Sequence, residues 1–201
     1  MHYYIPPVDE ETDFLKVSSP EELKIIDPAA GSGHMLTYAF DLLYAIYEEQ
    51  AYSPSEIPSK ILEHNLYGAE IDPRAGALAA FALTMKAAKK RKLFLKNPVQ
   101  PHICVLENVR FEQTDLDYLW SLTSGSIVRS DADAFWNAFD HADTFGSLIR
   151  PDEASLRILA PVADVLEASG NLLSIPVRRV LDQSFQLSSR YAVVVGNPPY
   201  M

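Results

Sequence analysis

The chain has 201 residues, of which 48% are hydrophobic, and a formal net charge of −10 at pH 7. This hydrophobic content supports a sizeable core and excludes a disordered chain, while the acidic balance argues against strong binding of nucleic acid by this chain alone. No apolar run approaches the roughly 20 residues that span a bilayer, and residues 1–4 do not resemble a signal peptide, so we expect a cytoplasmic protein without membrane contact.

The first half of the chain alternates predicted strands and helices after an irregular lead of about 20 residues. We expect strands at 24–27, 66–71 and 102–106 and helices at 33–50, 58–65 and 73–93, followed by a fourth strand at 191–196. This alternation is typical of a doubly wound parallel sheet in an α/β protein.

The segment between the third and fourth strands is too long for a structureless loop inside a compact domain. Its apolar residues recur at helical spacing, and turn signals at 124–126, 151–152 and 169–171 divide it, so we expect an insertion of three or four helices. The expected organisation is a first part at 1–107, a helical insertion at 108–190 and a last strand with its loop at 191–201.

Two short motifs directly follow apolar, β-branched runs. The motif DPAAGSG occupies residues 27–33 after Ile25-Ile26, and NPPY occupies residues 197–200 after residues 193–195. Both therefore lie where a buried parallel strand opens into a loop, which is where open α/β sheets bind their ligands.

Together these motifs resemble the cofactor loop and catalytic loop of S-adenosylmethionine-dependent, adenine-N6 DNA methyltransferases, and residues 27–43 resemble the PglX-like family of bacteriophage-exclusion systems. The resemblance covers about residues 3–201. It implies a partial methyltransferase sheet with strand order 3-2-1-4, transfer of a methyl group to adenine N6 in DNA, and a role in phage defence or restriction. It also implies S-adenosylmethionine as the cofactor, DNA bound through regions outside this chain, and defence-system partner subunits.

The glycine loop is the first expected part of the cofactor site. Glycines permit positive φ and close approach of a ligand, and the helix that follows offers unpaired N–H groups to the cofactor's carboxylate. The resemblance places Asp27 near the methionine amino group and the sulfonium, although a plain loop-capping role for Asp27 stays open. The expected cofactor-binding residues of this loop are Asp27, Ala29, Gly31 and Gly33.

Acidic residues at the ends of the second and third strands complete the expected cofactor site. Glu70 is the predicted ribose ligand, since one carboxylate accepts two hydroxyl donors, with a salt-bridged strand end or a role for Asp72 as alternatives. Asp72 is otherwise expected to cap the helix that Pro73 opens. Glu107 is the predicted acceptor for the cofactor's adenine amino group, but the family usually has Asp there, so Asn108 and a purely structural role remain open.

The second loop carries the expected catalytic residues, Asn197, Pro198 and Tyr200. The resemblance implies that the Asn197 side-chain oxygen and the Pro198 carbonyl accept N–H groups of the target amine, and that a flipped base stacks on Tyr200. A plain β-turn is the alternative. Similar loops also serve protein and RNA amino-group methyltransferases, and a non-catalytic scaffold stays open.

Other chemistry-bearing residues have simpler interpretations. His34 lacks partners at metal-ligand spacing and is expected to be a helix-start residue, and no metal site is predicted. Cys104 is expected to be a buried, inert thiol, and the basic cluster at residues 86–92 a solvated helix terminus. A nicotinamide site is disfavoured because Leu36 stands where the third glycine of its fingerprint would be.

The chain also resembles only the first half of a methyltransferase domain. An upstream Thr-Pro element is not convincingly present, and the sequence stops after the fourth strand. We therefore expect the isolated chain to be catalytically silent, to bind cofactor weakly at most, and to expose a sheet edge that favours self-association.

Overall fold

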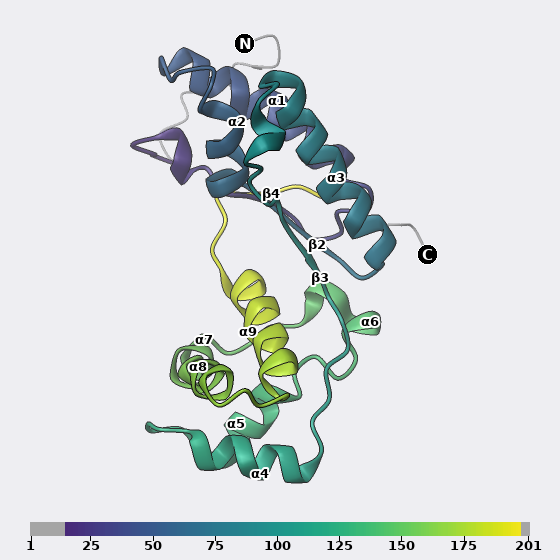
Figure 1. Cartoon of the computed structure of the whole chain (residues 1–201), viewed down its shortest axis with the longest axis vertical. Helices are drawn as coiled ribbons and strands as arrows, with labels where there is room; N and C mark the ends of the chain where they lie inside the picture. Colours follow the sequence, from purple (N-terminus) through teal and green to yellow (C-terminus); the bar gives the residue numbers. More distant parts are fainter. Residues whose placement is uncertain (1–14, 198–201) are drawn as a thin grey trace, which may run out of the picture.

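A sheet of four parallel strands organises the chain, and the computed structural model describes residues 15–197. The strands are β1 (Ile25–Asp27), β2 (Leu66–Glu70), β3 (His102–Val105) and β4 (Val193–Val194), in the order β3-β2-β1-β4 (Figure 1). This confirms the predicted α/β fold with strand order 3-2-1-4 and a helical stretch before the last strand. β4 is shorter than expected, and among the strands within residues 15–197 it pairs with β1 alone.

The helices that connect β1, β2 and β3 begin and end close to their predicted bounds. They are α1 (His34–Glu49), α2 (Ile57–Lys60) and α3 (Pro73–Lys90), with short turns η1 (Pro20–Glu22) and η3 (Phe94–Lys96). The predicted helix at 58–65 is divided, because α2 continues as a π-helical turn, η2 (Ile61–Asn65).

The first face of the sheet packs against α1 and α3. Gly68 of β2 is needed there, because a Cβ at this position would lie 2.7 Å from Cδ1 of Ile103 and 3.0 Å from Cδ1 of Leu36. The buried apolar residues of this face form one core, which includes Leu36, Phe40, Leu43, Tyr47, Ile57, Ile61, Leu62, Leu66, Leu83 and Phe94.

Six α-helices occupy residues 108–190, all of which the structure describes, so the expectation of three or four helices is wrong. They are α4 (Gln113–Leu122), α5 (Arg129–Trp136), α6 (Ala142–Phe145), α7 (Glu153–Leu159), α8 (Pro161–Ala168) and α9 (Ser174–Ser188), with the turn η4 (Gly146–Leu148). One reason is Pro161, which lacks a backbone N–H and separates α7 from α8. None of the helices within residues 15–197 has the length and apolarity needed to cross a membrane.

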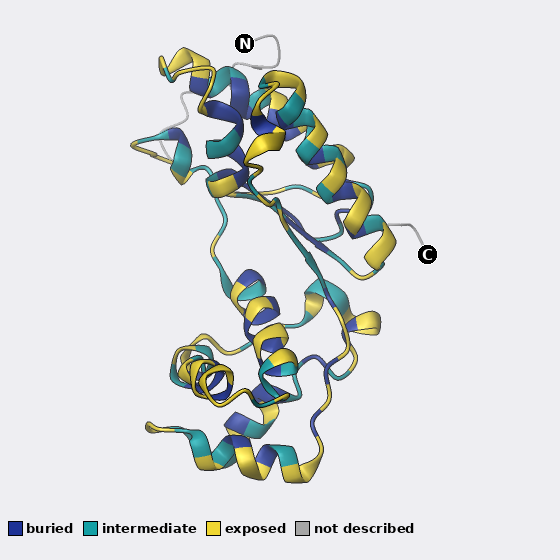
Figure 2. Cartoon of the chain, viewed as in Figure 1, coloured by how far each residue is buried: buried dark blue, intermediate teal, exposed yellow. Residues whose placement is uncertain are grey.

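These helices form a second core that reaches the other face of the sheet. Ala69 of β2 and Leu106 after β3 belong to this core, so it includes residues from the sheet as well as from the helices. Figure 2 marks buried positions along both the strands and these helices. Its largest buried residues include Leu119, Phe135, Trp136, Phe139, Leu159, Val162 and Val177. The cartoon shows α9 running from this helical body toward the sheet (Figure 1).

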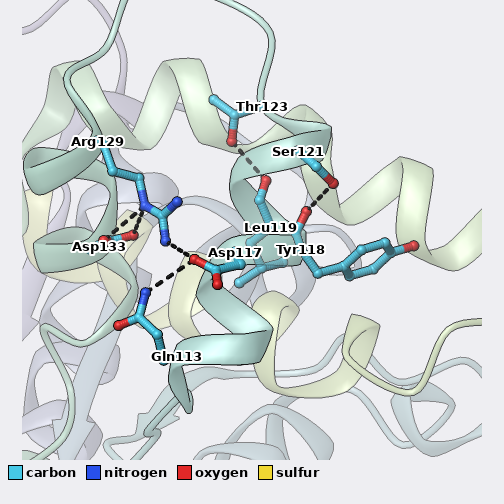
Figure 3. Close-up of polar contacts among 8 residues, drawn as sticks. All are labelled: Gln113, Asp117, Tyr118, Leu119, Ser121, Thr123, Arg129 and Asp133. Carbon is cyan, nitrogen blue, oxygen red and sulfur yellow. Dashed lines mark hydrogen bonds and ion pairs between the residues drawn. The ribbon is translucent and has the colours of Figure 1, made fainter.

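An ionic cluster ties α4 to α5 at the surface (Figure 3). Arg129 donates from Nε to both carboxylate oxygens of Asp133, at 2.8 and 2.9 Å, and from Nη2 to Asp117 at 2.7 Å. Gln113 donates to the same Asp117 oxygen at 3.1 Å. Because these groups are partly solvated, the cluster contributes little to the free energy of folding, and its main effect is to orient the two helices.

The close contacts of Gly68 lead to a prediction about stability. Gly68→Ala is expected to lower the free energy of unfolding by about 1–3 kcal/mol, because the new methyl group overlaps Ile103. Ile103→Val removes the nearest atom, so the loss should be smaller in that background. Urea denaturation of the wild type, the two single variants and the double variant measures the loss of unfolding free energy in each background. An equal loss from Gly68→Ala with Ile103 and with Val at position 103 would contradict the prediction.

Candidate functional site

The two loops singled out in the sequence meet at the carboxyl ends of β1 and β4. The Val195 N–H donates to the Ile26 carbonyl at 2.9 Å, which extends the pairing beyond β4. A Cβ on Gly196 would lie 3.6 Å from Cδ of Pro28 and 3.7 Å from Oδ1 of Asp27. Asn197, which is exposed, therefore follows directly from the point where the second loop touches the first. Pro198 and Tyr200 lie outside the described residues.

The glycine loop is held open by its backbone conformation. Gly31 and Gly33 have positive φ, of +53° and +82°. A Cβ on Gly33 would lie 3.0 Å from Ala79 of α3, so this position has no room for a side chain. A Cβ on Gly31 would meet nothing within 4 Å. Gly33 is also the N-cap of α1 and has no side chain to accept from the first-turn N–H groups. The first turn of α1 therefore keeps N–H groups without a side-chain cap, which suit an anionic group, and the loop leaves open space at Gly31.

Asp27 lies at the floor of this loop. Asp27 is only 1% exposed, and its Oδ1 accepts the N–H of Ala29 at 3.1 Å. Burial raises the pKa of the Asp27 carboxyl, and the nearby carboxylate of Glu70 raises it further. The hydrogen bond from the Ala29 N–H lowers this pKa, but by less than burial raises it. A buried carboxylate with so little compensation is a favourable neighbour for a cationic ligand group.

Glu70 links the glycine loop to the end of β2. Its Oε2 accepts the N–H of Gly31 at 2.6 Å, and its Oε1 accepts those of Ile71 and Asp72 at 2.8 and 2.9 Å. Asp72 in turn accepts the N–H of Arg74 at 2.9 Å, which confirms its predicted role as the cap of α3. Since a carboxylate offers about four acceptor positions, Glu70 retains capacity for one ligand donor.

Glu107 and Asn108, the two candidates after β3, both have protein partners. The Glu107 carboxylate accepts from Nη1 of Arg179 at 2.6 Å, and the Asn108 side-chain oxygen accepts the N–H of Asp143 at 2.9 Å. Both side chains therefore attach the strand end to the helical segment. The choice between them as an adenine acceptor stays a prediction.

Sequence reasoning missed the polar face that α9 turns toward the sheet. Arg179 binds Glu107, Gln183 accepts the Glu107 N–H, and Gln186 donates to the buried Gly68 carbonyl at 2.6 Å. These three residues follow i, i+4, i+7 spacing, which places them on one helix face. Glutamines on the apolar side of a helix were the available signal.

The remaining chemistry-bearing residues have local roles. His34 Nδ1 lies 2.9 Å from the Ser32 hydroxyl at the helix start, and no metal-binding group of His, Cys, Asp and Glu occurs in the described part of the chain. Cys104 is half-buried rather than buried, and burial, with smaller effects of Asp182 and Glu107, raises the pKa of its thiol to about 11. The thiol is therefore protonated at neutral pH and poorly reactive.

Part of the basic cluster at residues 86–92 packs on α1. Lys86 pairs with Asp41 at 2.6 Å, and the Lys90 ammonium lies 3.8 Å from the ring centroid of Tyr44. These contacts fasten the end of α3 to α1, which the expectation of a solvated helix terminus did not include.

This arrangement is a Rossmann-like parallel sheet in which two loops meet at one edge. Residues 64–201 match the family described as Eco57I restriction-modification methylase, and the chain belongs to that family. Glu70, Glu107 and Asn197 lie within the matched region, whereas the glycine loop precedes it.

Two similar curated proteins carry related names. The chain is 32% identical to the adenine-specific methyltransferase BrxX of Escherichia coli O9:H4 (strain HS), over 100% of this chain and 20% of that protein. It is 30% identical to the adenine-specific methyltransferase PglX of Lacticaseibacillus casei (strain Zhang), over 90% of this chain and 16% of that protein. The chain thus spans about a fifth or less of the length of these relatives.

The raised pKa of Asp27 generates a pH prediction. Asp27→Asn is expected to be more stable than the wild type at pH 7, because ionised Asp27 is penalised by burial. The gain should vanish below the ordinary aspartate pKa, grow as pH rises through the raised folded-state pKa, and then level off. Urea denaturation from pH 3 to pH 8 measures the difference in unfolding free energy. The exposed Asp41→Asn is the control without such a gain, and identical profiles for Asp27→Asn and wild type would refute the prediction.

The hydrogen bonds of Glu70 generate a second prediction. Glu70→Ala is expected to lower the free energy of unfolding by about 1–3 kcal/mol, because three backbone donors lose their acceptor. In the complete protein, it should also weaken S-adenosylmethionine binding at least about tenfold. Denaturation and calorimetry measure the two effects, with the exposed Glu49→Ala as the control. Unchanged affinity would remove Glu70 from the ligand site.

Proposed function

We propose that this chain carries the cofactor loop and catalytic loop of an enzyme that methylates the N6 amino group of adenine in DNA. The observation that carries the proposal is the hydrogen bond from the Val195 N–H to the Ile26 carbonyl, at 2.9 Å, which brings Gly196 and Asn197 beside Asp27 and Pro28 at the start of the glycine loop. Membership of a restriction-modification methylase family and the printed names of the two relatives support adenine as the target.

The proposed cofactor is S-adenosylmethionine, and the residues present suit its groups. The first turn of α1 has uncapped donors for the methionine carboxylate, and buried Asp27 suits the ammonium and sulfonium side. Glu70 retains an acceptor position for a ribose hydroxyl, and Glu107 or Asn108 lies next along the sheet edge for the adenine ring.

The proposed chemistry is direct methyl transfer. When bound, S-adenosylmethionine would supply an electrophilic methyl group, and the bond from this group to sulfur would break with the electron pair remaining on sulfur. The N6 lone pair would form the new C–N bond, and one N6 proton would leave to solvent. The Asn197 side-chain oxygen and the Pro198 carbonyl accept the amine's N–H groups and draw its lone pair out of conjugation with the ring, while Tyr200 stacks on the extruded base.

DNA binding is proposed to rely on other regions of the protein. The chain carries a net charge of −10, which repels phosphates, and two lysines of its basic cluster are engaged with α1.

The exposed edge of β4, where Val194 is 67% exposed, suits pairing with a further strand from the same protein or another copy. The family description supports a role in restriction-modification, and we propose phage defence as the purpose of that role. Methylation profiling of a host with and without the gene tests whether the protein methylates adenine in DNA.

Asn197 provides the sharpest test of the proposed chemistry. In the complete enzyme, Asn197→Ala is expected to reduce methylation of adenine-containing duplex DNA by about 100-fold or more, because the target amine loses an acceptor in the transition state. S-adenosylmethionine affinity, measured by calorimetry, should change by less than about twofold. The exposed Asn97→Ala is the matched control. Retained methylation by Asn197→Ala would refute the role.

A further inference from the structure

The chain enters β4 through a tyrosine that is anchored by both its hydroxyl and its ring. α9 ends at Ser188 and β4 begins at Val193, so Tyr191 lies in the short connection between them (Figure 1). The Tyr191 hydroxyl donates to the Gln186 carbonyl at 2.7 Å, and the ring packs edge-on against Tyr67, with 5.2 Å between the ring centroids. One side chain thus joins the end of α9 and the strand β2 to the start of β4.

The partners of Tyr191 are themselves held in place. The Gln186 carbonyl is among the last four of α9, which have no partner within the helix, and the Gln186 side chain donates to the Gly68 carbonyl at 2.6 Å. The Tyr67 ring stacks on His102 of β3, with 4.8 Å between the ring centroids. The position of Tyr191 is therefore fixed by α9, β2 and β3 together.

β4 has few other contacts that fix its register against β1. Two successive N–H groups, of Ala192 and Val193, donate to the same Lys24 carbonyl, at 2.8 and 3.1 Å. Val193 and Val194 are 41% and 67% exposed, so their burial does little to select one register. A slip by one residue would move Asn197 by about 3.3 Å along the strand and would exchange the faces to which the side chains point.

We propose that Tyr191 is a positioning residue for the catalytic loop, because its hydroxyl bond and ring packing fix the register of β4 and so set Asn197 beside the glycine loop. This inference rests on the proposed function and adds to it a residue that belongs to neither loop. Tyr191 precedes β4 and Asn197 follows it, so the effect of Tyr191 reaches the target amine only through the strand.

This role separates turnover from cofactor affinity. Asp27 and Glu70, the expected cofactor residues, lie on β1 and β2, and these two strands pair with each other independently of β4. A misplacement of a reacting group by about 1 Å can lower a rate by about 100-fold. Loss of the Tyr191 anchor should therefore lower turnover and leave cofactor binding intact.

The test measures kcat for methylation of adenine-containing duplex DNA by the complete enzyme, at saturating S-adenosylmethionine and DNA. Tyr191→Phe, which loses the hydroxyl bond, should lower kcat about tenfold, and Tyr191→Leu, which also loses the ring, about 100-fold. The dissociation constant of S-adenosylhomocysteine, measured by calorimetry, should change by less than about twofold in both variants.

Tyr52 provides the matched controls, Tyr52→Phe and Tyr52→Leu. Its hydroxyl donates to Glu21 at 3.0 Å, and its ring packs edge-on against Tyr47 with 5.0 Å between the centroids, but it lies in the turn after α1 rather than before β4. These variants lose the same kinds of contact, so urea denaturation should show a comparable loss of stability. Their kcat should stay within about twofold of the wild type.

Every other outcome counts against the proposal. Turnover by Tyr191→Phe within about twofold of the wild type would overturn the positioning role and leave the proposed function intact, and this variant decides the question if Tyr191→Leu does not fold. An equal fall in kcat in the Tyr52 variants, or a parallel loss of turnover and S-adenosylhomocysteine affinity, would indicate general destabilisation and also overturn it. Absence of methylation by the complete wild-type enzyme would overturn the proposed function and this inference together.

Discussion

The parallel pairing of β4 with β1 is the constraint on which the arrangement of the site depends. In the sequence, the two strands are separated by β2, β3 and the helical region. In the sheet they are neighbours, and Ile25 and Ile26 lie opposite Val193 and Val194. Because parallel strands end at one edge, the loops that follow them must leave the sheet side by side. The Val195 N–H, bonded to the Ile26 carbonyl at 2.9 Å, continues this pairing up to Gly196, which lies beside Pro28.

Electrostatics at this edge favours ligand binding over stability. Asp27 is buried with one backbone donor, and Glu70, a second carboxylate, is near enough to raise the pKa of Asp27 further. Glu70 is compensated by three backbone N–H groups, whereas Asp27 is not. An uncompensated buried charge destabilises the folded chain, and a cation at the crevice would relieve that penalty.

The helical region is attached to the site through hydrogen bonds as well as through its apolar core. α9 contributes Arg179, Gln183 and Gln186, which bond to the end of β3 and to the middle of β2. α6 is held by Asn108. A shift of this region would therefore be transmitted to the strand ends, since polar groups in directed bonds cannot slide as apolar surfaces do.

The local sequence alone determined the strands, the long helices and the two loops, because apolar runs, helical periodicity and the residues Gly, Asp and Pro act over a few neighbouring positions. Its resemblance to a known family supplied the strand order. Tertiary structure alone decided which acids and helices meet. Glu70 and Gly31 are 39 residues apart, Gln183 and Glu107 76, and Gln186 and Gly68 118. The number of helices at 108–190 also emerged only in the folded chain, where short helices such as α6 are stabilised by contacts from distant strands rather than by their own sequence.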